Sequence, residues 1–206
     1  MVSRAAPAVG LVLLLLAACT PGGTAAPLIV ASPPPSATTP STSSADANPS
    51  ASPGAAAPVA IDPSLLSVLP ATVDGLEVTE SVEAETTALA DPELSTIGLA
   101  LAAGIAVDGP TGQFVYAVVI SLKPGAMTDA AFGALRAAYD EGACSQADGI
   151  AAQGETQIAG RKVYTGTCVG GLRTYHVWLG SQDVVIAASA LGDRLLGERL
   201  LEGVRP

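Results

Sequence analysis

The second half of the chain alternates between apolar and polar positions in a pattern that predicts a β-rich domain. Its clearest strand covers 114–122, where β-branched and aromatic residues follow one another. A second strand is predicted over 99–107, and the turn residues of 108–112 predict an antiparallel hairpin between the two. Three more strands, separated by glycine-containing turns, are predicted over 162–168, 172–179 and 183–190.

Helical periodicity separates these strands. Phe132, Leu135 and Tyr139 share one face of a helix predicted over 129–141, and Gly142 is expected to end it. Shorter helices are predicted over 63–68, 83–90 and 194–203, the last capped by Gly192-Asp193, and the polar segment 145–155 is predicted to be a loop. Sequential strand pairs with segregated helices predict an α+β fold, an antiparallel sheet with packed helices, in a single domain over 61–206.

The chain before this domain has a different composition. Residues 1–18 combine Arg4 with an apolar run and then small residues, which is the pattern of a signal peptide. The run is too short to cross a bilayer as a permanent helix. Residues 19–60 are rich in Pro, Ser, Thr and Ala, and we expect them to form a disordered linker.

The junction between these two segments carries a specific motif. Leu16-Ala17-Ala18-Cys19 resembles the lipobox of bacterial lipoproteins. The resemblance implies that the Cys19 thiol receives a diacylglyceryl group with acyl chains such as palmitate, and that the chain is cut before Cys19. It therefore implies an extracytoplasmic protein that is lipid-anchored to the cell membrane through Cys19. The motifs of the folded domain resemble no family.

Charge narrows the set of partners. The formal net charge is -10, and the acidic residues lie almost wholly in the second part of the chain. This balance argues against a nucleic-acid partner and against attraction to an anionic membrane face. Seven acids and no base lie between Asp74 and Glu93, but they lack the spacing of a calcium-binding loop and favour a solvated face.

Two cysteines remain once Cys19 is assigned to the lipid. Cys144 and Cys168 form an even pair in an exported domain, which favours a disulfide bond between them. They do not form a Cys-x-x-Cys motif, so a thioredoxin-like role is not indicated. Free or metal-binding thiols are the alternative.

Candidate chemistry is sparse. His176 is the only histidine, and the period of a strand places it on one face with Thr174 and Trp178, as a base or as a structural residue. The sequence has no usual zinc set and no nucleophile elbow, and the glycine-rich segment 166–171 lacks the lysine of a phosphate-binding loop. We therefore predict no cofactor and no metal, and interpret 166–171 as a hairpin turn. A small basic spot for an anionic ligand, or for pairing with acids, is formed by Arg161, Lys162 and Arg173.

The expected function is binding rather than catalysis. We expect a non-enzymatic domain that binds an envelope protein or a small ligand. The alternatives are an envelope hydrolase or other enzyme that uses His176, and a purely structural surface protein. A deep pocket lined by His176 and acids favours the enzyme, whereas an apolar patch or groove favours binding.

Replacing Cys19 tests the predicted anchor. We expect Cys19→Ala to release the protein from the membrane fraction or to leave it unprocessed, because the thiol that carries the lipid is gone. Fractionation and mass spectrometry of the N-terminus measure both effects. Unchanged processing and membrane association would refute the lipoprotein hypothesis.

Overall fold

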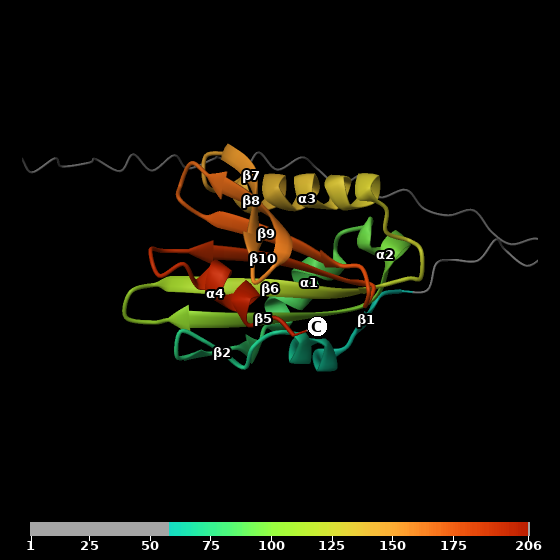
Figure 1. Ribbon diagram of the computed structural model, residues 1–206, viewed down its shortest axis with the longest axis horizontal. Helices are drawn as coiled ribbons and strands as arrows, with labels where there is room; N and C mark the ends of the chain where they lie inside the picture. Colours follow the sequence, from blue (N-terminus) through green and yellow to red (C-terminus); the bar gives the residue numbers. More distant parts are fainter. Residues whose placement is uncertain (1–57, 206) are drawn as a thin grey trace, which may run out of the picture. The chain divides into compact units, whose positions relative to one another are not determined.

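The computed structural model describes residues 58–205, so the predicted signal peptide, Cys19 and nearly all of the predicted linker lie outside the described residues. The described part forms an eight-stranded mixed sheet with helices packed against it (Figure 1). The α+β class is therefore present. The sheet is not antiparallel throughout, because the two-residue strand β1 pairs with β5 in parallel.

The order of strands across the sheet is β1-β5-β6-β10-β9-β8-β7, and β4 also pairs with β5. The strands of this sheet are β1 (Ala60–Ile61), β4 (Thr79–Glu80), β5 (Gly98–Asp108), β6 (Gln113–Leu122), β7 (Ile150–Ile158), β8 (Arg161–Cys168), β9 (Arg173–Leu179) and β10 (Val184–Leu191). A separate two-stranded sheet consists of β2 (Thr72–Val73) and β3 (Leu76–Glu77).

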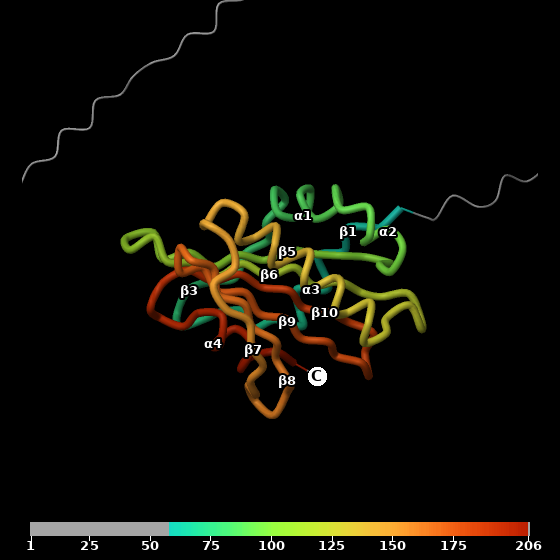
Figure 2. Tube along the Cα trace, turned by 90° about the horizontal axis from the view of Figure 1, so that it is seen from above, coloured from blue at the N-terminus to red at the C-terminus, as the bar shows by residue number. Residues whose placement is uncertain are grey.

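The helices are η1 (Pro63–Val68, a 3-10 helix), α1 (Val82–Leu89), α2 (Leu94–Ile97), α3 (Asp129–Cys144) and α4 (Leu196–Glu202). One core cluster brings η1 and α4 against one face of the sheet, and a second brings α1, α2 and α3 against the other. Figure 2 shows α1 and α4 on opposite sides of the sheet. The protein thus has helices on both faces of one central sheet.

The predicted hairpins are confirmed. β5 pairs with β6 from Ala100–Ser121 to Asp108–Gln113, and β8, β9 and β10 follow one another as antiparallel neighbours. Pairing of β6 with β10 joins the two groups of strands. The segment 166–171 forms the end of β8 and the turn into β9, as the hairpin interpretation requires.

Two predicted boundaries are wrong around the end of α3. The helix does not stop at Gly142 but continues to Cys144, because Gly142 does not adopt the left-handed conformation that ends a helix. The predicted loop 145–155 contains most of β7. Every position of this edge strand is exposed except Ile158, so the apolar alternation that reveals a strand is missing.

The start of α4 also differs from the prediction. Gly192-Asp193 does not cap the helix. Leu195 stands at the N-cap in the left-handed conformation, with a φ of 56° and no side-chain capping bond. Tight packing at Gly197, where an added Cβ would collide with the Tyr175 ring, fixes the position of α4 on the sheet instead.

Cys144 and Cys168 lie at disulfide distance, with their Cα atoms 5.2 Å apart. The pair joins the end of α3 to the end of β8, and both residues are buried. In the chain-entropy model, a link across 24 residues stabilises a fold by about 3.5 kcal/mol. The end of α3 thus lies against the end of β8, at a distance that allows a disulfide bond.

Candidate functional site

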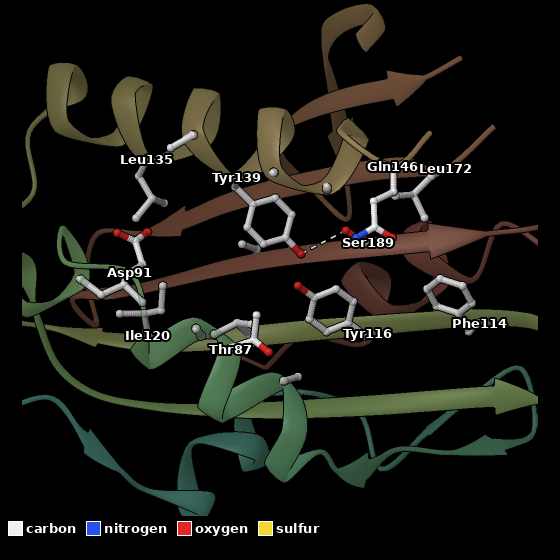
Figure 3. A pocket seen from close by; sticks show the side chains of 18 residues that line it. Thr87, Asp91, Phe114, Tyr116, Ile120, Leu135, Tyr139, Gln146, Leu172 and Ser189 are labelled. Carbon is white, nitrogen blue, oxygen red and sulfur yellow. Dashed lines mark hydrogen bonds between the residues drawn. The ribbon is translucent and has the colours of Figure 1, made fainter. Parts of the chain in front are cut away.

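The face of the sheet that carries α1 and α3 contains a groove with a volume of about 540 Å³. Its walls are α1 and α3, and its floor is formed by β6 and β10 (Figure 3). We call it the α1–α3 groove. Its size falls within the roughly 300–1,000 Å³ of small-molecule sites.

The floor of the groove results from the alternation of side chains along β6, in which every second residue points to the same face of the sheet. Alternate residues of this strand point to the same face and line the groove: Phe114, Tyr116, Val118 and Ile120. On the neighbouring strand β10, Ser189 is opposite Tyr116 and Ala187 is opposite Val118, and both also line the groove. The floor is therefore apolar except near Tyr116 and Ser189.

Small residues make up much of the walls. At helical spacing, α1 presents Ala84 and Ala88 to the groove, and α3 presents Ala138, Gly142 and Ala143. Larger residues at these positions would fill the space between the helices and the sheet. The high alanine content of the chain thus has a structural consequence, since it leaves this volume open.

A cluster of hydroxyl groups lies inside the groove. The Tyr139 hydroxyl and Ser189 Oγ are 3.1 Å apart and hydrogen-bonded, and the Tyr116 hydroxyl points toward that of Tyr139 (Figure 3). Burial, and then the neighbouring Tyr116, raises the pKa of Tyr139 well above its ordinary value. The Tyr139 hydroxyl therefore stays a neutral donor and acceptor.

Charge is scarce along the groove. Asp91, at the end near α2, is the only charged side chain among its lining residues. Its carboxylate accepts a hydrogen bond of 2.8 Å from the backbone N–H of Glu93, and Gln146 supplies a neutral amide toward the opposite end (Figure 3). The lining contains no Lys or Arg that could bind an anion.

Beside the groove, α3 carries a buried carboxylate. Asp140 is 3% exposed and accepts hydrogen bonds from Thr174 Oγ1 at 2.6 Å, His176 Nε2 at 2.7 Å and Gln153 Nε2 at 3.0 Å. Burial by itself would raise the pKa of Asp140, but the three hydrogen bonds outweigh it and hold this pKa below its ordinary value of 3.8. The carboxylate is therefore ionised and can only accept this hydrogen bond, so His176 donates it from Nε2–H.

His176 lies on the strand face predicted for it, with Thr174 and Trp178, but it is 1% exposed. Its Nδ1 is buried without a hydrogen-bond partner in residues 58–205. His176 and Asp140 line a small polar cavity of about 150 Å³ and do not line the α1–α3 groove. The candidate base and the large groove are therefore separate features.

The predicted basic spot is largely neutralised. Lys162 Nζ lies 2.9 Å from Glu155, Arg173 lies 3.5 Å from Glu198, and Arg161 donates to the carbonyl of Val204. Lys162 and Arg173 therefore pair with acids, one of the two predicted outcomes, whereas Arg161 bonds to a backbone carbonyl. Across the described part of the chain, no group of three or more His, Cys, Asp and Glu is placed to hold a metal ion. No helix between 58 and 205 is long and apolar enough to span a bilayer.

Reasoning from sequence missed both Asp140 and the groove. Asp140 lies eight residues after Phe132 and next to Tyr139, within the stripe of α3 expected to face the sheet. A carboxylate at such a position is the signal that points to a buried partner. The groove had no comparable signal, because its walls consist of alanines that fit a packed core equally well.

Gly166 offers a direct test of the Asp140 network. An added Cβ would collide with Thr174 Oγ1 and lie 3.0 Å from Asp140 Oδ2, whereas at Gly154 on the adjacent strand it would make an ordinary contact of 3.5 Å with Thr165. We expect Gly166→Ala to lower the free energy of unfolding by about 1–3 kcal/mol. Gly154→Ala, the matched control, should change it by less than about 0.5 kcal/mol. Equal effects in urea unfolding would contradict the close packing described here.

The lowered pKa of Asp140 predicts an acid-sensitive stability. Because its pKa is lower in the fold than in the unfolded chain, its contribution is fully present above 3.8 and is lost as pH falls further, through the folded pKa. Asp140→Asn should lower the free energy of unfolding by about 1.5–3 kcal/mol at about pH 7 and flatten its decline below pH 3.8. Urea titrations across this range, with exposed Asp193→Asn as control, measure the difference. The same acid slope in all three proteins would exclude Asp140 as its source.

Comparison of the chain with protein-family models, curated proteins and solved structures finds no match. The function proposed below therefore depends on the geometry of the groove and of its surroundings.

Proposed function

We propose that this protein is a lipid-anchored extracytoplasmic binding protein whose domain takes a small apolar ligand into the α1–α3 groove. The observation that carries the proposal is the groove itself, a volume of about 540 Å³ lined mainly by apolar side chains with a few polar groups among them. This combination is characteristic of small-molecule binding sites.

The groove is suited to an apolar guest because it is already open. Its walls need no side chain to move aside, since Ala88, Ala138 and Ala143 leave the space unfilled. A ligand that covers Phe114, Ile120 and Leu135 removes apolar surface from water, which favours binding by roughly 25 cal/mol per Å² before the costs of association.

The site of action is proposed from the N-terminal sequence. The lipobox-like motif ending at Cys19 supports an anchor in the membrane, and the composition of 20–60 supports an extended linker. At ~3.1 Å per residue, such a linker reaches on the order of 120 Å at most. The domain would therefore act within the envelope, near the membrane to which Cys19 is attached.

The two other hypotheses explain less of the structure. A purely structural protein has no use for an open apolar groove of this size. An enzyme that uses His176 would need substrate at the small polar cavity of about 150 Å³, where the His176 side chain is only 1% exposed. Binding is the function that the larger feature supports.

Filling the groove tests the proposal. We expect the mature protein to bind the uncharged dye Nile red with a rise in fluorescence, and Ala143→Leu to weaken this binding at least about tenfold by occupying the groove. The matched control is Ala134→Leu, the same change at an exposed position of α3 that lines neither the groove nor the small polar cavity.

The two variants separate binding in the groove from binding elsewhere. Both add the same apolar side chain to the same helix, so a general effect on dye partitioning would appear in both. No dye binding, or equal binding by Ala143→Leu and Ala134→Leu, would refute the groove as the ligand site. Unfolding curves of both variants check that the fold is retained.

A further inference from the structure

The chemical character of the ligand can be inferred from the polar atoms and charges of the α1–α3 groove. We propose that the groove selects an uncharged amphiphile, a hydrocarbon chain that carries a hydroxyl or ester oxygen, and discriminates against the anionic amphiphile of the same chain length. This inference rests on the proposed binding function and goes beyond it by naming the ligand class.

The lining of the groove disfavours a negatively charged ligand. The lining contains Asp91 and no Lys or Arg. The nearby guanidinium of Arg136 lies 3.6 Å from the centre of the Tyr164 ring and lines the small polar cavity instead. A carboxylate or phosphate in the groove would therefore lose hydration without gaining a cation, which is costly in an apolar environment.

The environment of the hydroxyl cluster also disfavours a negative charge. Burial already raises the pKa of Tyr139, so this part of the groove opposes a negative charge even on its own phenol. The domain as a whole also carries an excess of acids over bases. The surroundings of the hydroxyl cluster and the net charge of the domain thus both oppose an anionic ligand.

The hydroxyl cluster offers hydrogen-bonding groups to a ligand. The bond between Tyr139 and Ser189 uses one hydroxyl hydrogen of the pair, so the other hydrogen and several lone pairs are left. The Tyr116 hydroxyl faces the same point (Figure 3). An oxygen that is neutral and accepts or donates a hydrogen bond satisfies these groups, whereas a pure hydrocarbon leaves them without a partner.

The apolar walls on either side of this cluster indicate that the rest of the ligand is apolar. Ile120 and Leu135 line one side of the hydroxyl groups, and Phe114 and Leu172 line the other (Figure 3). The polar contact therefore lies within an apolar groove rather than at its mouth. A chain with an oxygen along its length matches this arrangement better than a chain that ends in a charged head.

Competition between two matched compounds tests the inference. Monododecanoin and dodecanoic acid share one acyl chain and differ in the glycerol ester and the free carboxylate. The protein is the mature chain from residue 19 with Cys19→Ala, which removes the acyl anchor without shortening the chain. At about pH 7.5 we expect monododecanoin to displace Nile red at a concentration at least about tenfold lower than dodecanoic acid.

Charge variants identify the origin of the preference. Asp91→Lys should reduce the ratio between the two competitors at least about threefold, since it places a cation at the groove, and Asp91→Asn should give an intermediate ratio. Asp193→Lys makes the same change of net charge at an exposed acid outside the groove lining and should leave the ratio unchanged. Tyr116→Phe should weaken monododecanoin more than it weakens Nile red.

The possible failures are distinguishable. Dye binding that dodecanoic acid displaces as well as or better than monododecanoin would overturn the ligand class and leave the binding function intact. Absence of dye binding would overturn both. At least tenfold tighter dye binding after Leu28→Ser, Ile29→Ser and Val30→Ser together would identify this apolar segment of the chain as the occupant and overturn the inference. Loss of dye binding as the protein dimerises in gel filtration would identify a second copy of the chain as the occupant of the groove. That result would also overturn the inference.

Discussion

The hydrogen bonds that Asp140 accepts are the interaction on which the position of α3 depends. Thr174 and His176 donate from β9 and Gln153 donates from β7, so the carboxylate holds the helix over that side of the sheet. Cys144 and Cys168 hold the end of the same helix to β8. With α3 held there and α1 packed over β5 and β6, the strip of sheet between the two helices remains open.

A second constraint is the small size of the residues in the sheet and in the helices that face it. Ala103, Ala117, Ala187 and Ala188 are almost completely buried in the central strands, so the sheet is thin where β5, β6 and β10 lie side by side. Larger residues supply the packing at the periphery, where Phe132 contacts Tyr164 and Trp178 at ring distances of 5.7 and 6.0 Å. Dense packing at the start of α3 and open space farther along it thus occur on one helix.

Much of the fold could be predicted from the sequence, because β6 and β9 are rich in β-branched and aromatic residues and glycine-containing turns separate the strands. The same reasoning failed at β7, whose exposed positions carry no alternation, and at Gly142, where a helix-ending residue lies inside a helix. The histidine was correctly placed on its strand face, but its partner Asp140 comes from a helix 36 residues earlier, and no local pattern encodes that distance. The groove was unpredictable for a related reason, since it exists only where two alanine-containing helix faces are held apart.

The exposed edge strand β7 has a consequence for proteins held at high density. Within the described residues β7 pairs only with β8, so its other side presents unpaired backbone groups that another chain could extend. An anchor on Cys19 would confine the molecules to two dimensions, where encounters between edges are frequent. Gly154 and Glu155 lie in the middle of β7, and Lys162 pairs with Glu155 from β8. Charge and a weak strand former at this edge oppose strand addition, so molecules confined by such an anchor would crowd without joining their sheets.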